Sequence, residues 1–575
     1  MLGNSQLRKC LFALDKRLFR QEGAPLRHFL HPKLETALRY IIRQAFLFSE
    51  ARHYRLWTAQ RLKERARIYQ PRPEKGLLSF VTTVWNTPVR YMEVLVKSLL
   101  VQWDRDSCEW IILDNGSSSP ATIAFLQGLT ANEGVRLHRI PENLGIIGGM
   151  RYCLERARNR YIVPLDSDDS LSPDCIRVLI AEIQRNGHPA LLYTDEDKLL
   201  HSKPTSPYFK PDWDPVLFLN SAYTAHLGVI DRNLALQLHA YTDAQATGSH
   251  DWDTFVRFLI NGFTPVHIPE ILYSWRMHPQ STASNITSKD YIHSSQKAVL
   301  ERYLASVPQS QKYRLDYSPL FKGTPDWWIR RRHDDARPLY CVVLSRDPCA
   351  VDIASPVKIA DSPKYSGCAV SPGETLAPLI PFVNEAASRN GLILFLSDQV
   401  KITNDEWFWE ALTLTEIHKD AVMIGGRIYN GEEIILDAGR YFGFGDGCGC
   451  PDRGRSLHDP GYFAQMWKQH SVSAVSTQFS VIDASFLHCT LVNNDLSGVK
   501  IRHLGPWVGI YALRKGKRVI YSPFFSGLSN EDWNQSLPPD DMEVFLETNR
   551  DILPDHRFFS RHLSLEGWRP YRLAV

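Results

Sequence analysis

Long apolar runs are absent from this 575-residue sequence, since no stretch of about 18 consecutive apolar residues occurs in it. The N-terminus also lacks the compact apolar segment of a secretory signal peptide. Neither a membrane span nor export is therefore expected. The expected location is the cytoplasm, either free in solution or peripheral at the inner face of the plasma membrane.

Paired cysteines and glycine-rich phosphate loops are also missing. The ten cysteines are scattered, and the one close pair, Cys448 and Cys450, has the spacing of no standard zinc or redox motif. Free thiols in a reducing compartment are expected. The turn after the first predicted strand, "VWNTPVRY", contains no glycine, which argues against a dinucleotide oxidoreductase. The glycine-rich "GFGDGCGC" at 443–450 has neither Walker nor Rossmann spacing and is interpreted as a loop.

What is present is an ordinary globular composition with an uneven distribution of charge. Apolar residues make up 44% and charged residues 22%, and the length predicts two or three domains. Residues 1–75 contain 17 Lys and Arg against 6 Asp and Glu, a balance of +11. The net charge is +3, so the rest of the chain carries a balance of −8.

The basic segment at 1–75 has apolar residues at three- and four-residue spacing, which predicts one or two amphipathic helices. Two interpretations stay open. The basic face is either a solvated helix surface, or it contacts an anionic membrane surface or an acidic partner. Nucleic acid is not expected as a partner, because the segment has no recognisable binding module and the body is acidic.

From residue 77 to 170, apolar strand patterns alternate with helical patterns, which predicts an α/β domain with a parallel sheet covered by helices. In such sheets, ligands bind beyond the carboxyl ends of the strands. The polar residues expected there, at or just after strand ends, are Thr87, Asp114, Asn115, Asn143, Asp166 and Asp168.

The segment "YIVPLDSDDSLSPD" at 161–174 joins an apolar strand to four carboxylates, and it allows two interpretations. Asp and Ser are common in turns and at helix N-termini, so the acidity is consistent with a simple structural role. Closely spaced carboxylates also form ligand sets for hard divalent cations. The segment alone does not decide between these.

An internal repeat favours the chemical interpretation. "NRYIVPLDSDDSLSPD" from Asn159 aligns without gaps with "NGLILFLSDQVKITND" from Asn390, and the region from Asp251 aligns with that from Gly505. The repeat predicts a duplicated domain. At the positions of Asp166, Asp168, Asp251 and Asp253, the second copy has Ser397, Gln399, Gly505 and Trp507. The second copy has thus lost carboxylates while keeping the strand and helix patterns.

Over about residues 77–300 the chain resembles a family 2 glycosyltransferase of the GT-A fold. The resemblance rests on "VTTVWNTP", "LDNGSSSP", "ENLGIIGGMR" and the Asp-x-Asp motif "LDSDD". The later segments "YTDEDKL", "YFKPDWDPVLFLNSAYTAHLG", "GSHDWDTFVRFL" and "ILYSWRMHPQSTAS" resemble bacterial transferases of O-antigen, capsule and related surface polysaccharides.

The resemblance implies a nucleotide-sugar donor site and a divalent cation, Mg²⁺ or Mn²⁺. Asp114 is expected to contact the base, Asp166 the ribose and Arg276 the diphosphate. The implied cation ligands are Asp168 and His278. Thr87 and Asn143 are expected at the same donor site.

The resemblance also implies that Asp251 is the general base of an inverting transfer, with His250 before it where Glu or Asp is common in the family. Asn115 stands where many relatives have a second Asp. A carboxylate base takes the proton from an attacking hydroxyl, and a cation stabilises the leaving diphosphate. Clustered aspartates also suit a two-metal phosphoesterase, but the further ligands of such an enzyme are missing.

The predicted organisation is a basic helical segment at 1–75, a catalytic GT-A domain at 76–320 and a degenerate GT-A-like domain at 338–575. The predicted activity is transfer of a sugar to a glycan or lipid-linked glycan acceptor during synthesis of a bacterial surface polysaccharide. Two alternatives remain: a bifunctional transferase with two active domains, and a non-catalytic glycan-binding or scaffold protein. Trp507 is expected either to stack on sugar rings or to pack in a core.

Overall fold

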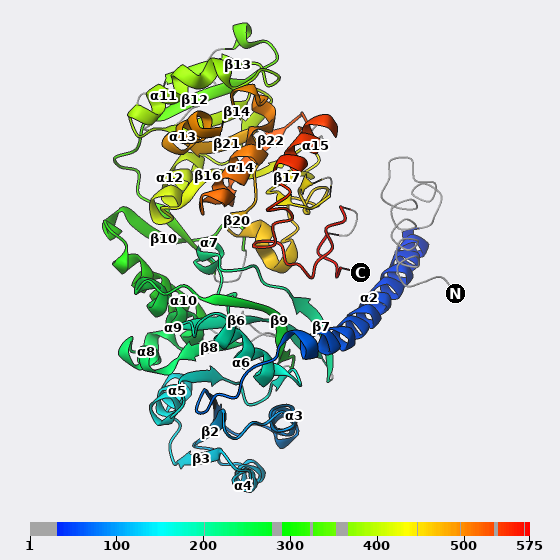
Figure 1. Ribbon diagram of the computed structural model, residues 1–575, viewed down its shortest axis with the longest axis vertical. Helices are drawn as coiled ribbons and strands as arrows, with labels where there is room; N and C mark the ends of the chain where they lie inside the picture. Colours follow the sequence, from blue (N-terminus) through cyan, green and yellow to red (C-terminus); the bar gives the residue numbers. More distant parts are fainter. Residues whose placement is uncertain are drawn as a thin grey trace.

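The structure is a computed structural model. It describes residues 32–200, 202–278, 290–321, 326–351, 366–445, 447–494, 496–533, 539–567 and 570–574. Two α/β units lie one above the other along the longest axis of the molecule, and a long helix runs along one side (Figure 1). Residues 1–31 of the predicted basic segment lie outside the described residues.

The first unit is built on a nine-stranded sheet with the order β3-β2-β1-β4-β8-β6-β9-β5, and β7 pairs with β6. Its first four neighbours, β3, β2, β1 and β4, are parallel. The strands are β1 (Leu78–Val84), β2 (Cys108–Asn115), β3 (Val135–Ile140), β4 (Tyr161–Pro164), β5 (Ser170–Leu171), β6 (Leu191–Leu200), β7 (Lys203–Tyr208), β8 (Gly228–Asp231) and β9 (Val266–Arg276).

Helices cover both faces of this sheet, as the alternating sequence pattern predicts. They are α3 (Val89–Leu100), α4 (Pro120–Leu129), α5 (Gly145–Arg156), α6 (Cys175–Arg185), α7 (Pro215–Phe218), α8 (Arg232–Gln237), α9 (His250–Ile260) and α10 (Asp290–Ser306). The strands β1 and β2 are almost entirely buried. Their apolar side chains fill the two core clusters on either face of the sheet.

The second unit is also built on a nine-stranded sheet, with the order β13-β12-β14-β21-β16-β22-β15. In addition, β17 pairs with β16 and β20 pairs with β22. The strands are β12 (Leu339–Leu344), β13 (Ser366–Val370), β14 (Leu392–Ser397), β15 (Val400–Ile402), β16 (Ala421–Tyr429), β17 (Ile435–Ala438), β20 (His470–Val472), β21 (Phe479–Asp483) and β22 (Arg518–Ser529). The helices are α11 (Ile380–Ser388), α12 (Trp407–Ile417), α13 (Ala484–Asn494), α14 (Leu504–Arg514) and α15 (Pro539–Thr548). A separate two-stranded sheet pairs β18 (Tyr441–Phe442) with β19 (Cys448–Gly449).

The two large sheets share one pattern of neighbours and directions. In the first, β4 is parallel to β1 and antiparallel to β8, β8 is antiparallel to β6, and β6 is parallel to β9. In the second, β14, β12, β21, β16 and β22 repeat these four relations in the same order. The short strands β5 and β15 are antiparallel to β9 and β22, respectively.

Between the units lies an antiparallel pair of strands, β10 (Tyr313–Tyr317) and β11 (Trp327–Arg331). The sequence pattern around 310–340 shows no periodicity, yet β11 is largely buried. Trp328 stacks on Phe524 with 3.8 Å between ring centroids and donates a hydrogen bond to Glu410. The segment that separates the predicted domains is therefore held against the second unit.

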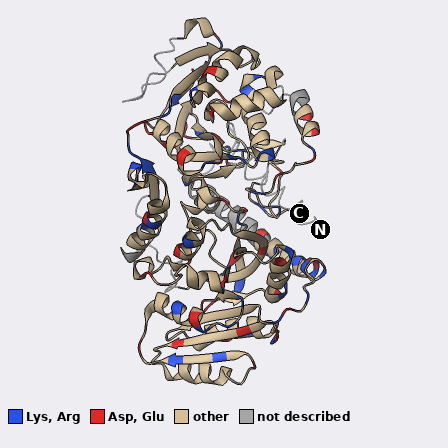
Figure 2. Ribbon diagram, turned by 60° about the vertical axis from the view of Figure 1, so that its left-hand side comes forward, with Lys and Arg blue, Asp and Glu red and all other residues tan. Residues whose placement is uncertain are grey.

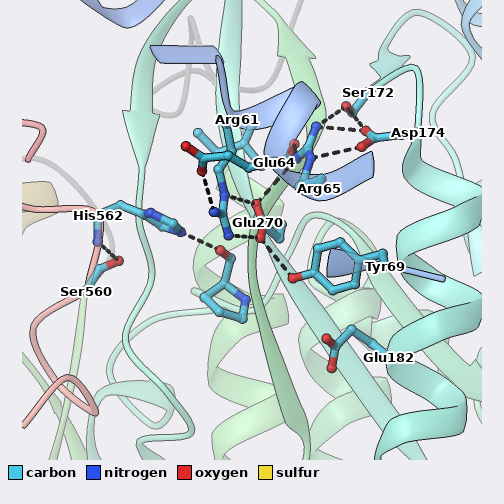
Figure 3. Close-up of polar contacts among 12 residues, drawn as sticks. Arg61, Glu64, Arg65, Tyr69, Ser172, Asp174, Glu182, Glu270, Ser560 and His562 are labelled. Atoms are coloured by element: carbon cyan, nitrogen blue, oxygen red, sulfur yellow. Dashed lines mark hydrogen bonds and ion pairs between the residues drawn. The ribbon is translucent and has the colours of Figure 1, made fainter. Parts of the chain in front are cut away.

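The helix α2 (Pro32–Ile68) runs along the first unit, and its C-terminal part is fastened to β9 (Figure 3). Arg65 donates hydrogen bonds to the Asp174 carboxylate and to the Ile271 carbonyl oxygen. Arg61 and Tyr69 both bond to Glu270. Because Arg65, Asp174 and Glu270 are almost fully buried, these are interior ion pairs.

The two units also contact each other directly, through the segment that follows β7. The Phe209 amide donates to the Tyr462 hydroxyl at 2.9 Å, and Tyr208 stacks on Phe463. The buried Asp214 carboxylate accepts from the Ser471 amide at 2.7 Å. One core cluster contains buried residues of both units, so the hydrophobic interior is continuous between them.

Charge is spread over the whole molecule, with basic and acidic residues interspersed on both units (Figure 2). Across the described residues, no helix combines the length and the apolar character needed to cross a bilayer.

Candidate active site

The carboxyl ends of β1 and β2 are joined by hydrogen bonds between the loops that follow them. Asn86 accepts from the Ser118 and Ser119 amides at 2.9 Å. Asp114, which is 1% exposed, accepts from the Ser117 amide at 2.9 Å. Its second oxygen lies 3.2 Å from Nε of Arg139. The predicted base-contacting carboxylate is thus fixed within a turn at the sheet edge.

Asn143 lies beside this turn. A Cβ atom on Gly116 would lie 2.8 Å from the Asn143 amide nitrogen, so only glycine allows the two loops to approach this closely. Asn115 accepts from the Leu144 amide and donates to the Gly145 carbonyl oxygen. Asn115 therefore orients the loop of Asn143, and its own amide is used inside the protein.

The predicted cation ligands Asp168 and His278 lie together. His278 Nε2 is 2.8 Å from an Asp168 carboxylate oxygen, and its ring stacks on Tyr91. Arg276 bonds through Nε to the Asp168 carbonyl oxygen, and its guanidinium lies 4.9 Å from the centre of the Tyr91 ring. A buried Arg276 Nη2 atom has no hydrogen-bond partner within the described part of the chain. This nitrogen is available to a ligand oxygen.

Asp169 fastens this loop to β9. Its carboxylate accepts from the Arg276 amide at 2.7 Å and from the Tyr273 hydroxyl. Burial raises the pKa of Asp169 well above its usual range, and the charges of Asp166 and Asp168 raise it further. Asp169 therefore has a structural role in holding the loop, which the sequence interpretation did not separate from the roles of its neighbours.

Asp166 and Asp251 line one small pocket, together with His226 and His250. Asp251 lies in the first turn of α9, and its side chain is 32% exposed. Asp166 follows β4 and is half exposed. Although one side of the carboxylate is open, partial desolvation by the surrounding protein raises the pKa of Asp166. The His226 charge opposes this shift, and the Asp168 and Asp251 charges add to it. Residues 85 positions apart thus meet at one end of the sheet.

His226 is a site residue that the sequence analysis missed. Its Nε2 lies 3.8 Å from the Asp166 carboxylate, and its Nδ1 lies 3.6 Å from Glu196. The backbone of His226 accepts from the fully buried Lys210 ammonium at 2.8 Å. Burial opposes the charge of this imidazole, but the nearby Glu196 and Asp166 carboxylates raise the pKa of His226 to about 9.

Thr87 joins the site through its neighbour in the Asp-x-Asp loop, since its hydroxyl lies 2.7 Å from that of Ser167. The predicted residues therefore form three groups: Asp114 with Asn143, Asp168 with His278 and Arg276, and Asp166 with Asp251.

His226, Glu196 and Lys210 stood in quoted motifs, but only the folded chain places them beside Asp166. No spacing in the sequence signals that contact.

The side chains of the site can be compared with the ligands that a divalent cation needs. Among the described residues, no group of three or more His, Cys, Asp or Glu side chains is arranged to hold a metal ion. The Asp168–His278 pair supplies one carboxylate and one imidazole, which are suitable donors for Mn²⁺ or Mg²⁺. Such a pair fits a cation whose other ligands come from the substrate.

The matching region of the second unit differs at the positions of these groups. Ser397, opposite Asp166, is buried and donates its amide to the Gln478 carbonyl oxygen. A Cβ atom on Gly505, opposite Asp251, would lie 2.0 Å from the Val475 carbonyl oxygen. Trp507 packs against Phe545 at 5.1 Å, as expected for a core residue.

Comparison with known proteins relates part of the first unit to a described family. Residues 79–211 match the sequence model of the family described as Glycosyl transferase family 2. The chain is 26% identical over 462 residues to the uncharacterized protein y4gI of Sinorhizobium fredii. That match covers 74% of this chain and 49% of that protein.

Two further relatives have names that describe a biosynthetic role. The O-antigen biosynthesis protein RfbC of Myxococcus xanthus is 25% identical over 286 residues, covering 47% of this chain and 22% of that protein. The putative teichuronic acid biosynthesis glycosyltransferase TuaG of Bacillus subtilis is 27% identical over 220 residues, covering 37% of this chain and 83% of that protein. The chain thus spans about half of the first relative and less than a quarter of the second.

Proposed function

We propose, from the premise that residues 79–211 form a family 2 glycosyltransferase domain, that the protein transfers a sugar from a nucleotide-sugar donor to a glycan or lipid-linked glycan. The observation that carries the proposal is the meeting of Asp166 and Asp251 in one pocket, at the strand ends that also hold the Asp168–His278 pair. The names of the relatives favour surface polysaccharide as the product.

Asp251 is the proposed general base. Its carboxylate lies in the first turn of α9, where it is partly exposed and able to reach an acceptor hydroxyl. As this hydroxyl attacks the anomeric carbon, Asp251 takes its proton while the bond to the diphosphate breaks. One base on the side opposite the leaving group gives inversion by direct displacement. A positioned base of this kind contributes roughly 10²- to 10⁴-fold to the rate.

The donor is proposed to lie across the strand ends. Asp114 and Asn143 hold the nucleoside part, Asp166 the ribose, and Arg276 directs its unpartnered nitrogen to the diphosphate. Asp168 and His278 would hold Mn²⁺ or Mg²⁺. When bound, this cation stabilises the negative charge of the leaving diphosphate as a Lewis acid. Thr87 supports the Asp168 loop through Ser167.

The second unit is proposed to be a degenerate copy of the first. The shared strand order and directions support duplication, because eight strands correspond in the same chain order. The backbone contact at Gly505 leaves no space for a carboxylate at the position of the base. The contacts of Tyr208, Phe209 and Asp214 with this unit favour a bracing role.

The direct test is incubation of the purified protein with a panel of nucleotide sugars, Mn²⁺ and an acceptor glycan, with products identified by mass spectrometry. Release of nucleoside diphosphate together with an extended acceptor is the expected result. The product linkage should show the opposite anomeric configuration to the donor. A protein that binds glycan but consumes no donor from a complete panel would be a binding or scaffold protein, and the proposal would be wrong.

The basic segment at 1–75 is proposed to bring the protein to an anionic membrane that displays lipid-linked acceptor. Flotation with vesicles that contain or lack anionic lipid tests this part separately. Binding is expected on anionic vesicles alone and should weaken as salt rises, because exposed charges are screened. Equal flotation on neutral vesicles would contradict it.

A further inference from the structure

A second cleft lies between the two units, at the end of β9 opposite to the candidate active site. Val266 begins β9 and Arg276 ends it, so the two ends are about 30 Å apart at roughly 3.3 Å per residue. The cleft has a volume of about 470 Å³, which is within the usual range for a small-molecule site. Its lining comes from the segment after β7, the start of β9, the turn before β22 and residues 557–561.

The lining is strongly basic. It contains Lys517, Arg518, Arg557 and Arg561. Arg518 and Arg557 have carboxylate partners, Asp420 at 3.0 Å and Asp555 at 3.1 Å. Lys517 and Arg561 are exposed, and neither has an ion-pair partner in the part of the chain that the structure describes. Neither Lys517 nor Arg561 is therefore held in an ion pair, although the buried Glu182 lies within electrostatic range of Arg561.

The one acidic side chain of the lining does not cancel them. The Asp212 carboxylate lies 2.8 Å from Nδ1 of His267, whose Nε2 lies 2.9 Å from the buried Asp195. Although burial opposes its charge, the two carboxylates raise the pKa of His267. Asp212 is therefore paired with the buried His267, although its own side chain is 46% exposed, and the four cations of the lining still outnumber it.

Aromatic side chains stand beside these charges. The half-buried Phe558 has the Arg557 guanidinium 5.0 Å and the Arg518 guanidinium 6.0 Å from its ring centre. Trp213, also half-buried, packs against Phe218 and lines the same cleft. A cleft lined by both flat apolar rings and cations without ion-pair partners suits a ligand that combines a sugar ring with an anionic group.

We propose that this cleft binds a phosphorylated sugar, with the phosphate between Lys517 and Arg561 and the ring against Phe558 and Trp213. Two unpaired cations match the charge of a phosphate dianion, and a guanidinium can bond two of its oxygens. The phosphate is either that of a soluble sugar phosphate or that of a lipid-linked sugar. The cleft is separate from the donor site, so it adds a binding function to the proposed transfer.

The test uses the full-length protein and α-glucose 1-phosphate as the probe, titrated by calorimetry at low salt. The double variant Lys517→Glu with Arg561→Glu should bind the probe at least tenfold more weakly. Lys515→Glu is the matched control, because Lys515 is exposed in the same turn but does not line the cleft. It should bind as the wild type does, and glucose itself should bind far more weakly than its phosphate.

Thermal unfolding and nucleotide-sugar binding of the double variant should be unchanged, which excludes misfolding and damage at the donor site. Flotation with vesicles of phosphatidylcholine, alone or with phosphatidic acid, separates the two phosphate sources. Flotation on phosphatidic acid that the double variant loses would assign the cleft to a lipid-linked phosphate. Flotation that the double variant keeps, as the basic segment at 1–75 alone would give, together with loss of soluble probe binding, would assign the cleft to a sugar phosphate. Probe binding within twofold of wild type in the double variant, or an equal loss in Lys515→Glu, would overturn the proposal.

Discussion

In the proposed transfer, single side chains at the strand ends divide the chemistry between binding and proton transfer. Asp168 pairs with His278 beside Arg276, whereas Asp251 stands in the first turn of α9 and shares a pocket with Asp166. Replacing either carboxylate should stop transfer, but for different reasons.

Asp168→Ala is expected to weaken Mn²⁺-dependent binding of the nucleotide sugar at least tenfold, because the cation loses a carboxylate ligand. Asp251→Asn should bind the donor normally and react roughly 10²- to 10⁴-fold more slowly, because the base is lost. Donor titration and single-turnover rates distinguish the two effects. Asp398→Asn, an exposed carboxylate in the second unit, is the matched control and should keep the full rate. Near-normal turnover in either active-site variant would contradict the assignment.

His226 predicts a pH dependence of stability. Its pKa is about 9 in the folded protein, against an ordinary value of 6.5. A raised pKa means that the stabilisation is complete below about pH 6.5 and is lost as the pH rises through 9. The wild-type melting temperature should therefore fall more steeply between pH 7 and 9.5 than that of His226→Gln. His458→Gln, which alters an exposed histidine beside Glu433, should follow the wild-type curve. Parallel curves for wild type and His226→Gln would argue against a charged His226.

At the scale of elements, α2 is attached to the first sheet by buried charges rather than by apolar contacts alone. Replacing Arg65 with Met leaves Asp174 and Glu270 with fewer counter-charges in the interior. The expected loss is about 3–5 kcal/mol of unfolding free energy, the usual cost of breaking a buried pair. Arg67→Met is the control, since Arg67 is exposed on the same helix and should change stability by less than about 0.5 kcal/mol. Chemical denaturation measures both, and equal effects would show that the buried pairs contribute little.

The sequence predicts most elements of the first unit correctly, and the exceptions have physical causes. The helical sequence pattern that runs from Gly149 to Asn159 corresponds to α5, but α5 begins four residues earlier, at Gly145. Glycine disfavours helix, so the glycines at 145 and 148 hide this first turn from a sequence pattern. A Cβ atom on Gly149 would lie 2.8 Å from the Thr83 side chain, so glycine is needed where α5 packs on β1. The strand β11 was not predicted, because its charged residues pair with side chains of α12 that are distant in sequence.

Residues of the candidate site that lie at strand ends could be predicted from the sequence. Residues that reach the site through contacts between loops could not. Asp114 was singled out because it stands at the end of an apolar strand, and Asp166 and Asp168 because an apolar strand ends just before them. His226 was missed because its partners, Asp166 and Glu196, lie 60 and 30 residues away with no periodic relation to it. Local sequence patterns indicate which residues lie at the end of a strand. They do not indicate which strand ends lie close together in the folded protein.

For the whole molecule, the question is whether the second unit has any catalytic role. A methyl group at Gly505 would overlap the Val475 carbonyl oxygen, so Gly505→Ala should destabilise the protein by about 3 kcal/mol or more. Gly498→Ala is the control, because a Cβ there has no neighbour within 4 Å among the described atoms. Thermal unfolding compares the two variants. Equal stability would show that the region can rearrange and accept a side chain.

Catalysis by the second unit is tested in the same molecule. A full-length protein that carries both Asp168→Ala and Asp251→Asn should incorporate no labelled sugar from any donor that the wild type uses. Incorporation by this variant would show a second active site, and the bracing role proposed for the second unit would be wrong.

The bond between His562 and the Pro269 carbonyl oxygen joins residues 293 positions apart, and it lies on the same edge of β9 that α2 covers. During synthesis on the ribosome, β9 emerges long before residues 555–574 exist. This edge of the first unit therefore stays incompletely covered while about half of the chain is still being translated. The contact that closes it forms only after the last segment has been synthesised.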